Sequence, residues 1–333
     1  MAGLTLGIAL RQRQVPVTVH ESGTYPRHRV CGEFINGRGN DVLRRLGLRE
    51  LLVQKGAKPA LSGCFISASG SSPVRVLPEP ALCLSRYVLD ALLAESFVGC
   101  GGVLRSGSRE ENANDEGTVR ASGRRRSTSE NGWRWFGLKA HAFNVRLSAD
   151  LEMHIFPDAY VGLCRLGDAE VNVCGLFRRR ASASEMPASR EEMLLGPANS
   201  ALRARLAESQ FVPGSFCSVA GLSLRPHRAV DYAECCIGDA LTMTPPVTGN
   251  GMSMAFESAE LAAEPLTAYS QEKLSWPEAR VAIANACDKA FRPRLACARA
   301  LQWMMFSPLL RGWLGRAALR SDWLWRVLFA STR

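Results

Sequence analysis

Hydrophobic and polar positions near the start of the chain alternate first like a helix and then like a strand. Residues 4–13 have helical spacing after Gly3, and residues 15–20 (VPVTVH) alternate like a half-buried strand that ends at Glu21. This order is typical of the second half of a dinucleotide-binding βαβ unit, in which a glycine is followed by a helix, a strand and, about 20 residues further on, a carboxylate. The first strand and the first two glycines of such a unit do not stand before Gly3.

Two helices are predicted further along. Residues 40–56 (NDVLRRLGLRELLVQKG) have amphipathic spacing, with Asn40 or Asp41 as the N-cap. Residues 84–97 (LSRYVLDALLAESF) predict a helix that Ser85 caps.

The middle of the chain reads as β-structure and the end as helix. Residues 61–78 alternate weakly between turn residues and predict a hairpin, and residues 136–177 contain four strand-like segments in a row, which predicts an antiparallel sheet. A helical insert follows at 185–208. Residues 234–266 read as a strand, a long loop and a helix, and residues 271–333 read as helical with many Trp, Leu and Arg.

The antiparallel block therefore interrupts an α/β unit. This order predicts a discontinuous cofactor-binding domain with an inserted substrate sheet. The predicted boundaries are 1–60, 81–135 and 218–270 for the cofactor domain, 61–80 and 136–217 for the substrate domain, and 271–333 for a C-terminal helical region.

Composition narrows the class of protein. Apolar residues make up 47% and charged residues 22% of 333 positions, as in ordinary globular proteins. The net charge of +10 comes mostly from Arg and fits a nucleic acid, an anionic membrane surface or a phosphate-bearing ligand. The Arg runs at 124–126 and 178–180 are short and lack interleaved aromatics, which favours solvated faces and predicts no nucleic-acid partner.

Cysteine use and the N-terminus predict a location. Eleven cysteines without any C-x-x-C pair indicate buried thiols in a reducing cytoplasm, rather than disulfides or a metal site. The N-terminus has no basic segment or cleavage site of a signal peptide, and no apolar run reaches membrane-spanning length. A cytoplasmic protein is predicted.

Two stretches carry candidate chemistry. Glu21, at the end of a strand, is placed to accept both ribose hydroxyls of an adenosine; the alternative is an ordinary surface acid. In the second stretch, Gly238 permits close backbone approach and Asp239 accepts from a polyol hydroxyl, before residues 249–251 (GNG) open a helix. The free amides of that helix end would stabilise negative charge on a reduced flavin ring. The alternative is a glycine-rich turn before a core helix.

These segments resemble the FAD-dependent oxidoreductases of the geranylgeranyl-reductase type, which have the p-hydroxybenzoate-hydroxylase-like flavoprotein fold. The resemblance extends to about residue 270 and is most specific in its last segment. It implies an α/β fold class: a FAD/NAD(P)-binding Rossmann-like domain, an inserted antiparallel β-sheet substrate domain and a helical C-terminal tail. The segments that carry it are AGLTLGIALRQRQVPVTVHE, RVCGEF, LSRYVLDALL, GLKAH, EMHIFPDAYVGL and IGDALTMTPPVTGNGMSMAFESAELAA.

The resemblance also implies which residues hold FAD. Gly3 and Glu21 would contact its ADP half, Arg86 its phosphates or ribityl chain, and Asp239, next to Gly238, its ribityl hydroxyls. The flavin ring would be lined by Thr248, Gly249, Asn250, Gly251 and Met252.

The same resemblance implies a catalytic loop and a substrate wall. Cys31, with Gly32 and Glu33, would face the isoalloxazine, where a thiol would tune the flavin or donate a proton; the alternative is a small cysteine that only packs. Opposite the flavin, Phe156 and Tyr160 would shape the substrate wall, together with His154. We expect His154 and His141 to be satisfied sheet residues rather than catalytic acids.

The chain departs from the family at its start and at 105–133. Loss of a central strand would leave buried backbone groups unpaired, at about 1–3 kcal/mol each. The start is therefore expected to be either wrongly assigned or that of a remnant gene. Residues 105–133 have little strand signal, and Val119–Thr128 is only a degraded match to a second flavin-contacting motif.

The predicted function is a FAD-dependent oxidoreductase, of reductase or monooxygenase type, acting on a hydrophobic small molecule such as an isoprenoid or aromatic compound. The electron donor would be NAD(P)H or a separate reductase. One alternative is a truncated, non-catalytic relative that holds no FAD. Another is a basic protein that binds a membrane surface through its amphipathic residues 300–333, which would make it membrane-peripheral.

Overall fold

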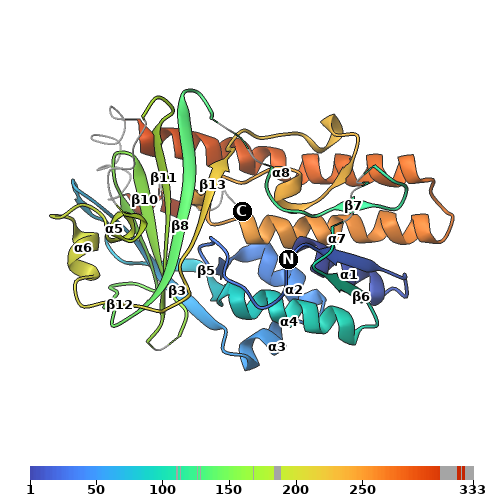
Figure 1. The fold of residues 1–333 in the computed structure, drawn as a ribbon, viewed down its shortest axis with the longest axis horizontal. Helices are drawn as coiled ribbons and strands as arrows, with labels where there is room; N and C mark the ends of the chain where they lie inside the picture. Colours follow the sequence, from blue (N-terminus) through green and yellow to red (C-terminus); the bar gives the residue numbers. More distant parts are fainter. Residues whose placement is uncertain are drawn as a thin grey trace.

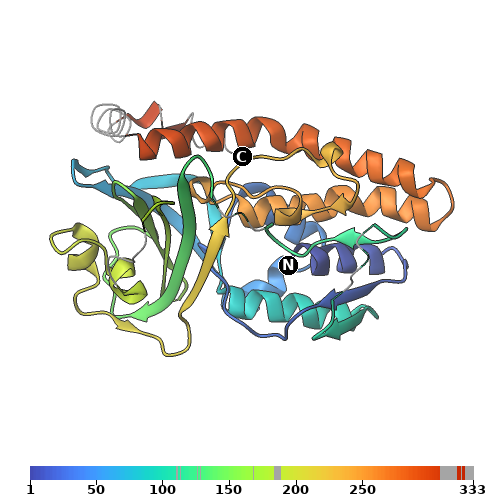
Figure 2. The ribbon, with the colours of Figure 1, turned by 45° about the horizontal axis from the view of Figure 1, so that its top comes forward.

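The computed structural model describes residues 1–307 and 321–326, apart from positions 110–111, 113, 126, 128, 168, 184–188 and 324. A sheet-rich half and a helix-rich half lie side by side (Figure 1). The long helix α8 (Trp276–Phe306) runs along both halves, as Figure 2 shows most clearly.

One ten-stranded sheet forms the first half. Its strands run in the order β12-β8-β11-β10-β9-β3-β5-β2, with β13 also pairing with β8 and β4 with β3. All pairs are antiparallel except β3 with β9. The strands are β2 (Phe34–Ile35), β3 (Lys58–Ser67), β4 (Gly70–Ser71), β5 (Arg75–Cys83), β8 (Trp133–Phe143), β9 (Leu151–Ile155), β10 (Ala159–Arg165), β11 (Val171–Arg180), β12 (Gln210–Phe211) and β13 (Cys217–Leu222). The hairpin and the four consecutive strands predicted from the sequence are confirmed.

The two faces of this sheet differ in chemistry. On β8, the alternate residues Leu138, Ala140 and Ala142 join an apolar core that includes Leu194 and Leu202 of the short helices α5 (Arg190–Leu195) and α6 (Ala201–Arg205). Because side chains alternate along a strand, Lys139 and His141 lie on the opposite face, toward the helix-rich half. A single strand thus supplies an apolar core on one side and a polar surface on the other.

The helix-rich half is built around α1 (Ala2–Arg11), α4 (Arg86–Gly99) and α7 (Gly251–Ser270). The side chain of Phe97 on α4 is fully buried between two glycines. A Cβ atom on Gly7 of α1 would lie 2.6 Å from its ring, and one on Gly102 would lie 2.2 Å from it. Glycine at these positions lets α1 and the chain after α4 approach closely.

The parallel part of the fold consists of two separate two-stranded ribbons. One pairs β1 (Thr18–Glu21) with β6 (Val103–Ser106), and the other pairs β7 (Val119–Arg120) with β14 (Cys235–Cys236). Among the described residues, no strand joins the two ribbons into one sheet.

The prediction for residues 40–56 is wrong in its bounds. The region forms two helices, α2 (Gly37–Arg45) with Asn36 as N-cap and α3 (Arg49–Gln54), which are separated near Gly47, where φ is 69°. Helix α2 begins early because it packs on α7: a Cβ atom on Gly39 would lie 2.6 Å from Ser253 Oγ. This tertiary contact cannot be predicted from the local pattern of apolar residues.

Other predicted helices are observed. Ser85 caps α4 by accepting a hydrogen bond from the Tyr87 amide. Helix α8 (Trp276–Phe306) begins with a capping box between Ser275 and Glu278. Among the described residues, none of the helices combines the length and the apolar composition that a bilayer span needs. The predictions for 308–320 and 327–333 lie outside the described residues.

Candidate functional site

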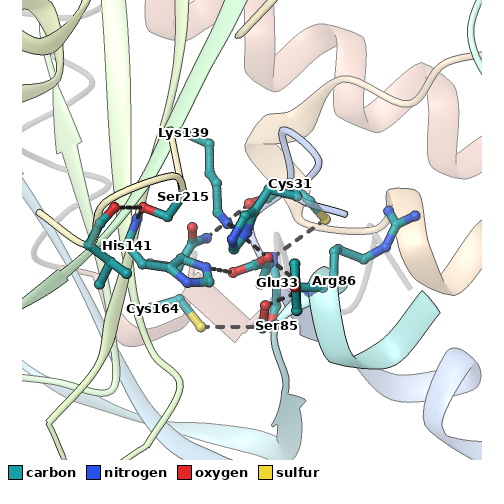
Figure 3. Close-up of polar contacts among 12 residues, drawn as sticks. Cys31, Glu33, Ser85, Arg86, Lys139, His141, Cys164 and Ser215 are labelled. Atoms are coloured by element: carbon teal, nitrogen blue, oxygen red, sulfur yellow. Dashed lines mark hydrogen bonds and ion pairs between the residues drawn. The ribbon is translucent and has the colours of Figure 1, made fainter. Parts of the chain in front are cut away.

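The candidate site lies where the loop after β1 meets the polar face of the sheet and the start of α4 (Figure 3). Glu33, just before β2, stands at its centre. Its side chain is fully buried and its φ is 60°, the left-handed region that a non-glycine residue rarely adopts. Such a conformation persists only where its surroundings hold it in place.

Three donors hold the Glu33 carboxylate. Oε1 accepts the backbone N–H of Arg86 at 2.8 Å and lies 3.3 Å from Lys139 Nζ. Oε2 lies 2.6 Å from His141 Nε2. A buried carboxylate is stable only with such partners, and these come from α4 and β8.

His141 connects Glu33 to a second carboxylate. Its Nδ1 lies 2.6 Å from Oε1 of Glu170, whose side chain is 36% exposed. Burial disfavours the charged imidazole, but the hydrogen bonds to Glu170 and Glu33 outweigh this effect and raise the pKa of His141. Both ring nitrogens of His141 are therefore engaged by carboxylates.

Lys139 continues the network in the other direction. Its ammonium group donates to Nδ1 of His28 at 3.0 Å, and its side chain is fully buried. Burial, together with Lys139 and His141, lowers the pKa of His28, which favours the neutral imidazole as the acceptor. The family resemblance places Glu33 on the loop expected to face the isoalloxazine, the sequence predicts no role for Lys139, and His141 is expected to be a satisfied sheet residue. A Lys-x-His pair on one face of a largely apolar strand was the available signal.

Cys31, the predicted catalytic thiol, lies in the same loop. Its sulfur accepts the Glu33 N–H at 3.5 Å, and its carbonyl accepts from Nδ2 of Asn172 on β11 at 2.9 Å. Burial raises the pKa of Cys31, although the charge of Arg86 opposes this. The thiol is therefore neutral, and both the catalytic and the packing interpretation of Cys31 remain predictions.

Arg86 links this loop to the predicted cofactor residues. Its guanidinium donates to Asp90 at 3.1 and 2.6 Å, and both side chains are nearly buried. Burial opposes the charge of Asp90, yet the adjacent Arg86 prevails and lowers the pKa of Asp90. The same guanidinium also acts electrostatically on Cys31 and Asp239.

Asp239 has no comparable partner. Desolvation raises the pKa of Asp239 to about 6 despite the opposing charges of Arg86 and Arg124. Within the part of the chain that the structure describes, its carboxylate forms no hydrogen bond or ion pair of its own. The preceding Gly238 has φ 60°, and a Cβ atom there would lie 3.0 Å from the Cβ of Ala2. A partly buried carboxylate left without a donor fits a ligand that brings hydroxyl groups.

The start of α7 provides the next group. The helix begins at Gly251 after Asn250, whose side chain forms no capping hydrogen bond in the described part of the chain, so its first amides remain available to a negatively charged ligand. Beside it, Gly249 has φ 64°, and a Cβ atom there would lie 2.2 Å from the ring of Phe34. Thr248 precedes this turn, and the buried Met252 follows it in the core that also contains Ile35 and Leu82. The five residues predicted to line a flavin ring are therefore contiguous around this helix end.

The residues predicted for the ADP half are already engaged. Glu21 Oε1 accepts from the Gly23 amide and Arg27, and Oε2 accepts from the Tyr25 hydroxyl at 2.8 Å. Burial opposes its charge, but these hydrogen bonds lower the pKa of Glu21. A Cβ atom on Gly3 would lie 3.1 Å from that of Ala121. A ribose at Glu21 would have to replace or share these donors.

The three predicted substrate residues do not line one wall. His154 contacts Glu152 at 3.2 Å, and Glu152 contacts Arg205 on α6, so this pair lies on the sheet face covered by α6. Phe156 packs in the same apolar core. Tyr160 lies on the other face, against Phe306 and Gln302 of α8. Only Tyr160 shares a face with Lys139 and His141, because His154 and Tyr160 point to opposite sides of the sheet.

Comparison with known proteins supports the fold. No family model matches the sequence. Among curated proteins, Conditioned medium factor receptor 1 of Dictyostelium discoideum is 27% identical over 124 residues, which cover 34% of this chain and 24% of that relative. The matched segment is thus about a quarter of the relative's length.

Three solved structures are similar over nearly the whole chain. The flavin-dependent brominase Bmp2 superposes with a TM-score of 0.76 and 16% identity, covering 99% of this chain and 90% of that one. A flavoprotein/dehydrogenase from Cytophaga hutchinsonii gives 0.72 and 13%, over 93% and 85%. The Pseudomonas aeruginosa protein pqsL, titled "a probable FAD-dependent monooxygenase", gives 0.67 and 14%, over 94% and 96%. The predicted fold class is confirmed, whereas the closer resemblance to geranylgeranyl reductases remains a prediction.

Proposed function

We propose that this chain is a FAD-dependent oxidoreductase. The observation that carries the proposal is the unpartnered, partly buried Asp239, which lies near Arg86 and Arg124 and is followed by the uncapped start of α7. FAD requires a carboxylate to accept hydrogen bonds from its hydroxyl groups and cations to bind its phosphates. It also requires helix amides to stabilise the flavin ring when the ring becomes negative. The similar fold of three solved proteins that their titles describe as flavoproteins or flavin-dependent enzymes supports it.

When bound, FAD would supply the redox chemistry, and the protein would supply binding and orientation. Asp239 would hold the ribityl chain, Arg86 the phosphates, and residues 248–252 the ring. The polar sheet face with Tyr160 would lie toward a hydrophobic substrate of isoprenoid or aromatic type. The enzyme would either reduce or hydroxylate this substrate. NAD(P)H or a separate reductase would be the electron donor.

The test is FAD binding by the purified chain and by Asp239→Asn, followed by flavin absorbance and fluorescence. Loss of a charged acceptor costs about 1.5–3 kcal/mol, so the variant should bind FAD about tenfold to hundredfold more weakly. Asp158→Asn, which changes an exposed aspartate paired with Arg178, is the matched control and should bind as the unchanged chain does. Equal FAD retention by Asp239→Asn and the unchanged chain would refute the assigned role.

A second candidate is a non-catalytic relative that holds no FAD. The hydrogen bonds that already occupy both oxygens of Glu21 favour it, as do the two unjoined parallel ribbons. A purified chain that is colourless, and that stays colourless after incubation with FAD, would support this candidate against the first.

The location of the protein is also part of the proposal. We infer a reducing compartment, the cytoplasm, because the eleven cysteines are all free thiols. Peripheral contact with an anionic membrane through residues 300–333 is supported by Trp303, whose side chain is 67% exposed. Co-sedimentation with anionic vesicles, with and without these residues, tests the membrane contact.

A further inference from the structure

A surface pocket lies between α2, α7 and α8 and contains none of the residues proposed to hold FAD. Helices α7 and α8 run side by side in both ribbon views (Figures 1 and 2), and α2 packs on α7. The pocket has a volume of about 430 Å³. Its lining combines the cations Arg38, Lys289 and Arg294 with apolar residues that include Leu261 and Ala290. This combination fits a ligand with an apolar body and an anionic group.

Arg294 is the buried member of the three cations, with a side chain that is 5% exposed. Its Nη1 donates to both oxygens of Glu257 on α7, at 2.9 and 2.7 Å. A guanidinium carries five N–H donors, so three remain on Nε and Nη2. Nε is buried without a hydrogen-bond partner, and Nη2 has none among the described residues. These two nitrogens form the edge by which an arginine holds an oxyanion with two parallel hydrogen bonds.

The other two cations are exposed and are not neutralised. Nη1 of Arg38 lies 4.0 Å from Glu257, beyond hydrogen-bond distance, and the Arg38 side chain is 59% exposed. Lys289 is exposed and forms no ion pair with any residue that the structure describes. The neighbouring acid Glu260 is already held by Arg45, at 2.5 and 2.7 Å. Three cations thus face one free carboxylate, which leaves two positive charges unbalanced.

We propose that this pocket binds a small phosphate monoester with an apolar body. Such a group carries a charge of about −1.5 to −2 at pH 7, which matches the unbalanced positive charge. Its oxygens accept from the unused edge of Arg294 and from the ends of Arg38 and Lys289, and its apolar body lies against Leu261 and Ala290. Cations gathered in one place repel each other, and a bound dianion removes this repulsion. The proposal requires neither FAD nor a redox reaction.

The test is a titration of the full chain with phenyl phosphate, followed by 31P NMR. Lys289→Ala should weaken binding about threefold to tenfold, because it removes one cation from the pocket without disturbing the buried pair of Arg294 and Glu257. Lys289→Arg should keep most of the affinity. Benzoate, which has a similar apolar body but a single charge, should bind more weakly than phenyl phosphate, and equal affinities would contradict the choice of phosphate.

Arg299→Ala is the matched control. Arg299 is also an exposed cation on α8, but it does not line the pocket, so its removal changes the net charge equally and should leave the affinity unchanged. Equal weakening in Lys289→Ala and Arg299→Ala would show attraction to the whole basic surface. That result, or unchanged binding in Lys289→Ala with circular dichroism showing a folded protein, overturns the proposal.

A second variant should change the affinity in the opposite direction. Glu257→Gln removes the carboxylate that repels the phosphate, while the amide oxygen still accepts from Nη1 of Arg294, so phenyl phosphate should bind about threefold more tightly or better. Weaker binding in a folded Glu257→Gln would contradict the site. Arg38→Ala, an exposed change, should weaken binding about threefold to tenfold and tests the pocket even if Glu257→Gln does not fold.

Discussion

Glu33 and Asp239 are two desolvated carboxylates near the same arginine, and the chain treats them in opposite ways. Glu33 is surrounded by an amide, an imidazole and an ammonium group. Asp239 has cations in its surroundings but no donor in contact, and its pKa rises to about 6. The difference teaches how to separate buried polar groups that stabilise the protein from groups that bind a ligand. The first have all their hydrogen-bond partners within the protein, and the second do not.

The largest expected effect is that of Glu33→Ala. Removing one member of a buried ionic cluster leaves Lys139 and His141 without their shared partner, which costs about 3–5 kcal/mol of the free energy of unfolding. Urea denaturation measures this loss. Glu192→Ala, on an exposed ion pair, should change the same quantity by about 0.5 kcal/mol or less. A small loss for Glu33→Ala would remove the contrast with Asp239.

In the protein without ligand, Asp239→Asn should increase the free energy of unfolding, whereas Glu33→Ala decreases it. A folded pKa of about 6 against 3.8 in the unfolded chain means that the folded state holds the proton more tightly. Stability therefore falls as pH rises from about 4 to about 6, by up to about 3 kcal/mol, and stays lower above that range. The variant should lack this fall and be more stable than the unchanged chain at pH 7. Parallel profiles for the two proteins would show that Asp239 is not desolvated.

Glu170→Gln should give the smallest effect. Because the folded pKa of His141 is raised, its contribution is fully present below the unfolded value and is lost as pH rises through the folded one. Removing Glu170 should lower the folded pKa and reduce this loss. The difference should be about 1 kcal/mol, since solvent screens a side chain that is 36% exposed. Thermal denaturation between about pH 5 and 9 measures it, and an unchanged profile would contradict the pairing.

The features that the sequence predicted correctly are those that depend on local contacts. The Ser85 cap, the four strands after Trp133 and the glycine turn before α7 each depend on residues close together in the chain. Glu33 and His141 are 108 positions apart, and only the folded sheet brings them into contact. The family resemblance implied that Phe156 and Tyr160 shape one wall. The turn between β9 and β10 places them on opposite faces, which a motif does not reveal.

The enclosure of Phe97 has a consequence for how this protein can vary. With an aromatic ring filling the space between α1 and the chain after α4, neither Gly7 nor Gly102 can gain even a methyl group without displacing that ring. A smaller side chain at 97 would release both positions at once. Variation at these three sites should therefore be correlated, and a lone change at either glycine would shift the N-terminal helix relative to α4 and Asp90.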